Sequence, residues 1–203
     1  MRLGLLADVH EDNEHLRVAL ARFRQHGVHQ VVLLGDICET GDSLAETVDL
    51  LVEAKAVGVW GNHDFGFGRD FAWLERMGHS AKVRQFIAGL LPRLEIAQCL
   101  FTHVEPWLDT SDVSNLWYLE GMPDTLEKVA RSFDAVPHPV MFVGHFHRWM
   151  IATRREILDW QGATPICLDS KERYLVLLGA ASHGHFAVFD TDALELTPHT
   201  CGR

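Results

Sequence analysis

The chain has 203 residues, of which 47% are hydrophobic and 23% are charged. This length favours one domain with a sizeable core, and the composition excludes the disordered, collagen-like and fibrous classes. The 28 acidic residues against 18 basic ones give a net charge of −10. That sign opposes bulk binding to extended nucleic acid or to an anionic membrane, because such binding neutralises phosphates with Lys and Arg.

The apolar runs and the cysteine spacing of the sequence indicate the cellular compartment. No apolar run approaches the ~18 residues of a membrane span, and the apolar stretch Leu3 to Ala7 is shorter than the ~7–15-residue core of a signal peptide. The four cysteines are Cys38, Cys99, Cys167 and Cys201. None stands in a CxxC spacing, so a zinc ribbon or a small disulfide scaffold is a poor interpretation. We expect a cytoplasmic protein with reduced thiols.

The first third of the chain alternates between strand and helix patterns. We expect a strand at Arg2–Ala7, a helix at Asp12–His26, a strand at Val28–Leu34, a helix at Ser43–Lys55 and a strand at Ala56–Trp60. The helices show apolar residues three and four positions apart, whereas the strands are short apolar runs. This alternation is typical of parallel β-α-β units.

The middle of the chain is less regular. We expect one or two helices within Arg69–Leu90, a strand pair across Glu95–His103, a surface loop or cap at Val104–Met122, a helix at Asp124–Phe133 and a buried strand at Pro139–Val143. The strand pair turns near Ala97-Gln98, and Asp124 is the expected N-cap of its helix.

The last third contains short segments separated by turns: Trp149–Arg154, Glu156–Trp160, Arg173–Leu178, His185–Asp190 and Leu194–Thr197. This spacing predicts an antiparallel meander. We therefore expect an α/β fold of two sheets packed face to face with helices outside, the first sheet mostly parallel and the second mostly antiparallel. No repeat, low-complexity tract or linker interrupts the chain, which favours a single domain over residues 1–203.

Polar side chains follow five of the expected strands, each at the point where the strand ends. They are two carboxylates, one amide and four imidazoles: Asp8, His10, Asp36, Asn62, His103, His145 and His147. The loops after parallel strands share one edge of a sheet, where ligand sites form. Glycines precede the polar residues in three segments, at positions 35, 61 and 144, and allow sharp turns and close backbone approach.

This donor set predicts a metal centre. Asp and His together suit manganese, iron, zinc or nickel, whereas calcium and magnesium sites are usually all oxygen. Seven donors exceed one tetrahedral site but suit two ions that share a bridging ligand, the arrangement that supports in-line displacement at phosphorus. With two divalent ions, two carboxylates and a bridging hydroxide, the local charge is about +1, which would attract a small phosphorylated substrate.

The motifs resemble those of the calcineurin-like metallophosphoesterase family and stand in the same order. They are Asp8-Val9-His10, Gly35-Asp36, Gly61-Asn62-His63-Asp64, His103 and Gly144-His145-Phe146-His147. The resemblance covers residues 1 to about 150 and implies the family's four-layer α-β-β-α sandwich, in which two mixed sheets face each other with helices outside. It also implies a metal-dependent phosphoric ester hydrolase with two divalent ions, manganese being favoured in vitro.

The resemblance implies a role for each motif residue. One metal would take Asp8, His10, Asp36 and His147, and the other Asp36, Asn62, His103 and His145, with Asp36 as the bridge. His63 would bind the phosphate beside Asn62 or protonate the leaving oxygen, and Asp64 would orient His63.

Departures from the family's motifs indicate which branch of the family the chain resembles. Protein serine/threonine phosphatases and symmetrical dinucleoside-tetraphosphate hydrolases carry an Arg shortly after Gly-Asp, but Ile37 to Gly41 contain none. The protein phosphatases also have Arg at the position of Trp60, and purple acid phosphatases have a Tyr ligand at the position of Glu39. The chain is most similar to the small bacterial and archaeal phosphodiesterases, although Glu11 breaks their DxHGN motif and Leu178–Ser182 replaces their Asn-Pro-Gly-Ser.

Each singled-out residue also has a structural interpretation. Asp8, Asp36 and Asn62 are common in turns and caps, and a strand-end histidine such as His103 is often structural. The position two residues beyond Asp36, Cys38, could touch a metal or respond to oxidation, or fill a small buried space.

Two further groups remain open. His183 and His185 either line the site or lie on the surface. Trp107, Trp117 and Tyr118 either stack on an aromatic part of the substrate or pack a cap over the core.

The function that these residues favour is hydrolysis of a phosphodiester by in-line attack of a metal-bridging hydroxide, with His63 as general acid. A small-molecule phosphomonoesterase and a non-catalytic scaffold of the same fold are the alternatives, and a nuclease is opposed by the charge of −10. The oligomeric state and the native metal pair stay open at this point.

Overall fold

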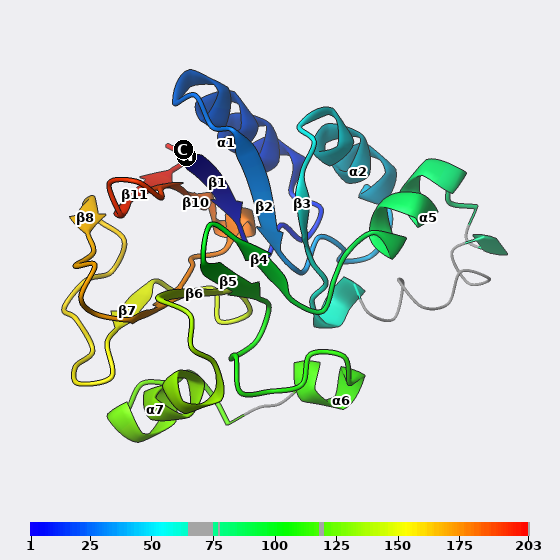
Figure 1. The fold of residues 1–203 in the computed structure, drawn as a ribbon. Helices are drawn as coiled ribbons and strands as arrows, with labels where there is room; N and C mark the ends of the chain where they lie inside the picture. Colours follow the sequence, from blue (N-terminus) through cyan, green and yellow to red (C-terminus); the bar gives the residue numbers. More distant parts are fainter. Residues whose placement is uncertain (65–74, 77, 118–119, 203) are drawn as a thin grey trace.

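The computed structural model describes residues 1–64, 75–76, 78–117 and 120–202. Two sheets face each other in the centre of the molecule, with helices on their outer sides (Figure 1). This is the expected α/β class, and the expected arrangement of two mixed sheets with helices outside is confirmed. The prediction of helix within Arg69–Leu90 falls partly outside the described residues.

The first sheet has six strands in the order β3-β2-β1-β10-β11-β8. In chain order they are β1 (Arg2–Leu6), β2 (Gln30–Leu34), β3 (Val57–Val59), β8 (Ile166–Cys167), β10 (His185–Asp190) and β11 (Glu195–Thr200). The neighbouring pairs β1–β2 and β2–β3 are parallel, and the pairs from β1 through β10 and β11 to β8 are antiparallel. The sheet therefore joins a parallel half, built early in the chain, to an antiparallel half built last.

The second sheet has five strands in the order β4-β5-β6-β9-β7. They are β4 (Leu94–Ile96), β5 (Cys99–Thr102), β6 (Val140–Val143), β7 (Met150–Ala152) and β9 (Tyr174–Leu177). Its three central strands run parallel, and antiparallel strands flank them on both sides. The predicted hairpin between β4 and β5 is present, with Ala97 and Gln98 at its turn at φ +50° and +64°.

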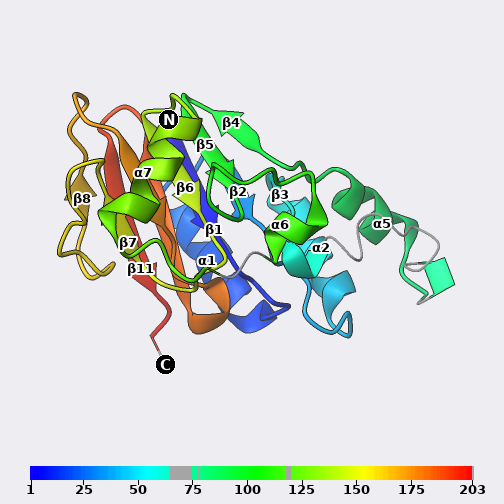
Figure 2. The ribbon, with the colours of Figure 1, turned by 90° about the horizontal axis from the view of Figure 1, so that it is seen from below.

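Helices cover the outer face of each sheet. The described helices are α1 (Asn13–Gln25), α2 (Leu44–Glu53), α5 (Ala81–Ala88), α6 (Val113–Leu116), α7 (Leu126–Ala135) and the 3₁₀ turn η1 (Ala181–His183). In Figure 1 α1 and α2 lie above the first sheet and α7 lies below the second, and Figure 2 shows α7 across the second sheet from below. Buried apolar side chains form three clusters between the layers of helices and sheets. One lies between the first sheet and helices α1 and α2, one between the two sheets, and one between the second sheet and α7.

The last third of the chain departs from the predicted meander. Its strands divide between the two sheets, and β9 pairs in parallel with β6 at the centre of the second sheet. All four residues of β9 are buried, which is the pattern of a central strand covered on both faces and not of a meander with one wet face. The expectation of one mostly parallel and one mostly antiparallel sheet is wrong for the same reason, since each sheet contains both kinds of pairing.

Smaller differences concern local boundaries. The segment Glu156–Trp160 contributes only one isolated bridge, from Ile157 to Ala152, while the two-residue strand β8 was not predicted. Helix α7 is capped by Thr125, whose hydroxyl accepts from the N–H of Lys128 at 3.4 Å, and not by Asp124. Both residue types cap helices well, so the sequence alone allows either start.

The strand directions bring six loops to one edge. Strands β1, β2 and β3 of the first sheet run parallel to one another, as do β5, β6 and β9 of the second, and the segments after their carboxyl ends meet. Backbone hydrogen bonds tie these segments together: the N–H of Asp8 donates to Gly35, the N–H of Gly144 to His103, and the N–H of Ser182 to Asp8. The polar residues predicted after the strands are therefore held in a common framework.

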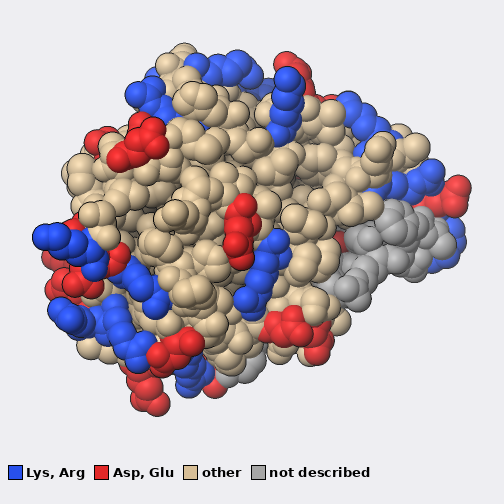
Figure 3. All heavy atoms as spheres, viewed as in Figure 1, with Lys and Arg blue, Asp and Glu red and all other residues tan. Residues whose placement is uncertain are grey.

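Surface charge is mixed on the face that Figure 3 shows, where acidic and basic side chains alternate. Among the described residues, ion pairs such as Arg17–Glu46 and Arg131–Glu120 join side chains of opposite charge. All four cysteines are free of disulfides, as predicted. Among the described helices, none combines the length and apolar character that crossing a bilayer would require.

Candidate metal centre

The seven predicted ligands converge on the shared edge. They come from the segments after β1, β2, β3, β5 and β6. Four of the side chains are buried, those of Asp8, Asp36, Asn62 and His103, with exposed fractions of 0 to 6%. The remaining three, His10, His145 and His147, are partly exposed and form the mouth of the site.

One group of donor atoms surrounds the first predicted metal position. The Nε2 atoms of His10 and His147 lie 3.2 Å apart. His147 Nε2 is 3.5 Å from Asp8 Oδ1, and His10 Nε2 is 3.8 Å from Asp36 Oδ2.

A second group lies on the other side of Asp36. His103 Nε2 is 3.4 Å from Asp36 Oδ2 and 2.9 Å from Asn62 Oδ1. His145 Nδ1 is 3.0 Å from the same Asn62 oxygen and 3.3 Å from His103 Nε2. Asp36 Oδ2 therefore faces both groups, as a bridging ligand would.

These separations fit divalent ions. Ligand bonds of 2.0–2.2 Å at right angles place neighbouring donor atoms about 3 Å apart. The donor–donor distances of 2.9 to 3.8 Å lie close to that value. In three overlapping sets the carboxylate and imidazole atoms all lie within 4.8 Å of one another: Asp8, His10 and His147; His10, Asp36 and His63; and Asp8, Asp36 and His103. The residues present thus suit two neighbouring ions of the kind that accept both oxygen and nitrogen.

A hydrogen bond at the other ring nitrogen determines which nitrogen of His103 and of His10 faces the donor cluster. His103 Nδ1 lies 2.7 Å from the carbonyl oxygen of Leu34, so that nitrogen donates its proton and Nε2 carries the lone pair. His10 Nδ1 is 2.7 Å from Glu39 Oε2, which again leaves Nε2 toward the centre. The N–H of His145 donates to both carboxylate oxygens of Asp8, at 3.0 and 3.1 Å.

The backbone of the site is strained. Among described residues other than glycine, ten have positive φ, and six of these belong to the site: Asp8, His10, Glu11, Asp36, His145 and His147, with φ from +47° to +66°. The left-handed region costs ordinary residues about 1–3 kcal/mol each and is best tolerated by Asn, Asp and His. The sequence held a signal for this, since Asp and His stand directly after the strands, but it does not reveal the dihedral angles.

Two glycines make the close approach of the loops possible. A Cβ at Gly61 would lie 2.0 Å from Asp36 Oδ1, and a Cβ at Gly35 would lie 2.6 Å from His103 Nδ1. Gly35 also has φ +90°. The prediction that glycines at these positions allow close approach is confirmed, and any larger residue would displace Asp36 or His103.

The buried groups perturb one another. Burial would raise the pKa of Asp36, but the charge of His103, its hydrogen bond to Asp36 and the N–H of His63 together outweigh burial and hold that pKa well below its usual range. Burial would lower the pKa of His103, but the Asp36 carboxylate raises it to about 9. Burial lowers the pKa of His145 to about 4, and the charge of His103 acts in the same direction. In the metal-free chain a proton therefore sits between Asp36 and His103, where a cation would otherwise sit.

His63 lies at the open side of the site. Its N–H donates to Asp36 Oδ1 at 2.9 Å, and its ring lies edge-on to that of His10, with centroids 4.8 Å apart. Its Nδ1 is 3.4 Å from Glu39 Oε2. Glu39 thus contacts both His10 and His63, a role that sequence analysis did not assign.

Asp64 occupies a different place from the one predicted. Its side chain is fully buried, and its two oxygens accept from the N–H groups of Ile37, Cys38 and Gly61 at 2.8 to 3.0 Å. These bonds join the loop after β2 to the loop after β3. The carboxylate beside the His63 ring is Glu39, so the contacts of Asp64 are those of a residue that holds the loops and not of one that orients His63.

The structure shows where Cys38, His183 and His185 lie, the residues whose roles the sequence left open. Cys38 is fully buried, and burial strongly raises the pKa of its thiol, so it is an inert filler in this structure. His183 lies beside His147, with ring centroids 5.3 Å apart, whereas His185 faces Trp149 at 6.0 Å and Thr200. His183 therefore borders the site, and His185 does not contact it through these groups.

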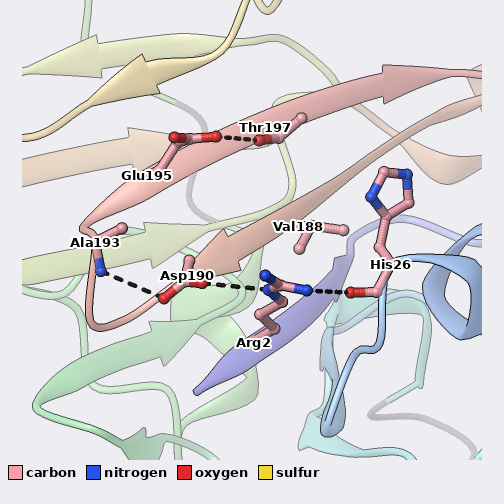
Figure 4. Close-up of a pocket in the computed structure, with 7 residues that line it drawn as sticks. All are labelled: Arg2, His26, Val188, Asp190, Ala193, Glu195 and Thr197. Atoms are coloured by element: carbon pink, nitrogen blue, oxygen red, sulfur yellow. Dashed lines mark hydrogen bonds and ion pairs between the residues drawn. The ribbon is translucent and has the colours of Figure 1, made fainter.

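A separate groove of about 370 Å³ lies at the opposite end of β1 (Figure 4). Arg2, Asp190, Glu195 and Thr197 are among its lining residues. The Arg2 guanidinium donates to Asp190 and to the carbonyl oxygen of His26, so its charge is already engaged. The groove is remote from the carboxyl ends of the strands and takes no part in the cluster.

The chain is similar in sequence to known proteins. The sequence profile of the calcineurin-like phosphoesterase superfamily domain matches residues 1–179. The chain belongs to this superfamily. It is also 24% identical over 197 residues to an uncharacterized protein of Methanocaldococcus jannaschii, covering 88% of this chain and 75% of that protein.

Solved structures of the superfamily share the fold. A metallophosphoesterase from Sphaerobacter thermophilus superimposes with a TM-score of 0.78 and 25% identity, over 100% of this chain and 88% of that one. A novel archaeal phosphodiesterase gives a TM-score of 0.57 and 14% identity, over 99% and 100%. As a calcineurin-like phosphoesterase, the chain is a hydrolase of phosphoric esters with a candidate site for metal ions.

Proposed function

We propose that the protein is a phosphodiesterase that uses two divalent metal ions. One ion is held by Asp8, His10, Asp36 and His147, and the other by Asp36, Asn62, His103 and His145. When bound, the ions supply Lewis acidity and a water of lowered pKa as the nucleophile for in-line displacement. Manganese, iron, zinc and nickel all suit this donor set.

The chain's own residues position and protonate the substrate. The amide of Asn62 and the imidazole of His63 hold the phosphoryl oxygens as negative charge develops on them. His63 also gives a proton to the leaving oxygen, because it is the partly exposed imidazole next to the donor cluster. The Glu39 carboxylate, whose Oε2 lies 3.4 Å from His63 Nδ1, orients that ring.

The observation that carries this proposal is the pair of donor groups that share Asp36. Distances of 3.4 Å to His103 and 3.8 Å to His10 place one carboxylate oxygen against both groups. A single site would need fewer donors, and a scaffold would not need six strained residues around two buried carboxylates.

Charge favours a diester over a monoester. Every ion-pair partner that the described residues give to Asp8, Asp36 and Glu39 is a histidine. Glu39, with an exposed side-chain fraction of 49%, adds a negative charge at the open side of the site. That charge lowers the positive charge that the site would otherwise present, which disfavours a doubly charged monoester more than a singly charged diester.

The test is metal-dependent hydrolysis of two esters. The protein is treated with a chelator, reloaded with manganese and assayed with bis(p-nitrophenyl) phosphate and p-nitrophenyl phosphate. The proposal predicts faster turnover of the diester, abolished by chelator and restored by metal. Faster turnover of the monoester would establish the alternative of a small-molecule phosphomonoesterase, and no turnover with metal bound would favour a binding scaffold.

A further inference from the structure

The segment between β5 and α7 places one large aromatic side chain in solvent beside the site. Trp117, which follows α6, has an exposed fraction of 52%, the highest among the large hydrophobic residues that are exposed in the described chain. Its indole ring lies 5.7 Å from the imidazole of His63, centroid to centroid, at an interplanar angle of 36°. The exposed indole is therefore a neighbour of the group that would protonate the leaving oxygen.

The rest of this segment is packed against the body of the protein. Val104, Leu108 and Leu116 are buried in a small apolar cluster with Trp60 and Trp107. The indole N–H of Trp60 donates to the carbonyl oxygen of Thr110, and the hydroxyl of Thr110 donates to Pro92.

Arg93 fixes the same segment from the other side. Its guanidinium donates to the carbonyl oxygens of Pro106 and Leu108 at 2.8 and 2.5 Å. The described part of the segment is thus anchored to the body of the protein, and Trp117 is not a member of its apolar cluster, which Leu116 joins instead.

The two tryptophans of the segment differ in their surroundings, whereas Tyr118, which the sequence prediction grouped with them, lies outside the described residues. Trp107 packs in the cap: its indole N–H donates to Glu105, and the Arg131 guanidinium lies over its ring at 5.2 Å. Trp117 instead keeps half of its surface in water next to His63. The half-exposed indole offers a flat aromatic face on which a ligand ring can stack.

We propose that Trp117 is a stacking platform for a flat aromatic group of the substrate, on the leaving-group side. This inference rests on the proposed function and narrows it to phosphodiesters that carry an aryl group or a nucleobase. Aromatic rings stack with centroids about 4.5–7 Å apart. A ring that stacks on Trp117 is therefore held beside the neighbour of His63, on the side where the leaving oxygen receives its proton.

Binding of two small probes tests the proposal. Adenosine 5′-monophosphate and ribose 5-phosphate share the phosphate and the sugar and differ by the base. Dissociation constants for both are measured by calorimetry on the manganese-loaded wild type and on Trp117→Ala, Trp117→Phe and Val113→Ala. The last variant removes another exposed apolar side chain, on α6, and serves as the matched control.

The proposal predicts that the wild type binds the nucleotide about tenfold more tightly than the sugar phosphate, as expected for one stacked base. Trp117→Ala loses that preference without weakening ribose 5-phosphate, Trp117→Phe keeps most of it, and Val113→Ala keeps all of it. Equal binding of the two probes by the wild type, or equal weakening of both in Trp117→Ala, would overturn the proposal. Turnover of bis(p-nitrophenyl) phosphate by the wild type, measured separately, shows whether the phosphoesterase itself has failed.

Discussion

The candidate centre has a buried half and an open half, and the two are built differently. The buried half consists of Asp36, Asn62 and His103, with exposed fractions of 2%, 6% and 0%. The open half consists of Glu39 and His63, whose side chains have exposed fractions of 49% and 32%. Each half contains an acid facing imidazole, but only the buried pair is shielded from water.

The difference in burial determines how strongly the carboxylate and the imidazole of each half interact. Asp36 and His103 interact at low dielectric, and the Asp36 carboxylate raises the pKa of His103 to about 9. The pair of Glu39 with His63 is screened by solvent and contributes little to stability. We infer that the buried half creates the metal site and that the open half handles the substrate, so the two halves should respond differently to substitution.

The largest effect is expected in the buried half. Asp36→Asn removes the charge that both donor groups share, so we expect loss of metal binding and a fall in diesterase activity of at least about 10³-fold. Metal content after gel filtration and kcat/KM measure the two effects. Asp42→Asn, on an exposed acid nearby, is the matched control. Full activity in metal-loaded Asp36→Asn protein would contradict the assignment.

In the open half we expect chemistry to fail while the metal stays. His63→Ala removes the proposed proton donor, which lowers kcat by roughly 10²–10⁴-fold. The metal content of the purified variant should equal that of the wild type. Loss of metal together with activity would show that His63 belongs to the buried half in function.

Asp64 supports the boundary between the halves and should affect stability first. Asp64→Ala leaves the N–H groups of Ile37, Cys38 and Gly61 without their buried acceptor, which we expect to cost about 2–4 kcal/mol. Asp64→Asn retains one oxygen and should cost less. Urea unfolding of the metal-free proteins measures both. An unchanged unfolding midpoint in Asp64→Ala would refute this role.

A smaller effect is expected on the activity toward monoesters relative to diesters. Glu39→Gln removes a negative charge next to His63 but keeps the shape, so the activity on p-nitrophenyl phosphate relative to bis(p-nitrophenyl) phosphate should rise roughly threefold to tenfold. Asp42→Asn again serves as control. If the ratio does not move, the charge of Glu39 does not select the diester.

Protonation gives the smallest and most specific signal. In the metal-free chain the Asp36 carboxylate holds the pKa of His103 at about 9, so His103 is charged at pH 7.5, whereas burial lowers the pKa of His145 to about 4 and leaves it neutral. Metal binding should therefore release about one proton from this pair, and affinity should fall as the pH is lowered. Calorimetry in buffers of different ionisation enthalpy counts the protons. Release of none would contradict the pairing of Asp36 with His103.

The sequence predicts the location of the centre well because its logic is topological. Residues that directly follow parallel strands must meet at one edge, and Asp8, Asp36 and His103 do so. The division of the donors into two groups is what the resemblance to the family implies, and the binding of an ion by each group stays a prediction. Helix α1, with its N-cap Asp12 and its buried apolar face, follows from local pattern alone.

What could not be predicted depends on how the loops fold back on one another. Glu39 is 29 residues from His10, and its contact with that ring arises because Glu11 accepts from three backbone N–H groups of the segment that contains Glu39. Asp64 stands next to His63 in sequence, yet its side chain points to the loop after β2. Pairing of β9 with β6 likewise depends on a long-range register that no local pattern determines.

The most direct test of the account is a manganese titration of the chelated protein, in which bound metal and turnover of bis(p-nitrophenyl) phosphate are followed together. The shared Asp36 predicts two ions per chain, with magnetic coupling between them in the electron paramagnetic resonance spectrum. Activity should appear with the second equivalent. Saturation of activity at one uncoupled ion per chain would contradict the central claim that two metal sites share this carboxylate.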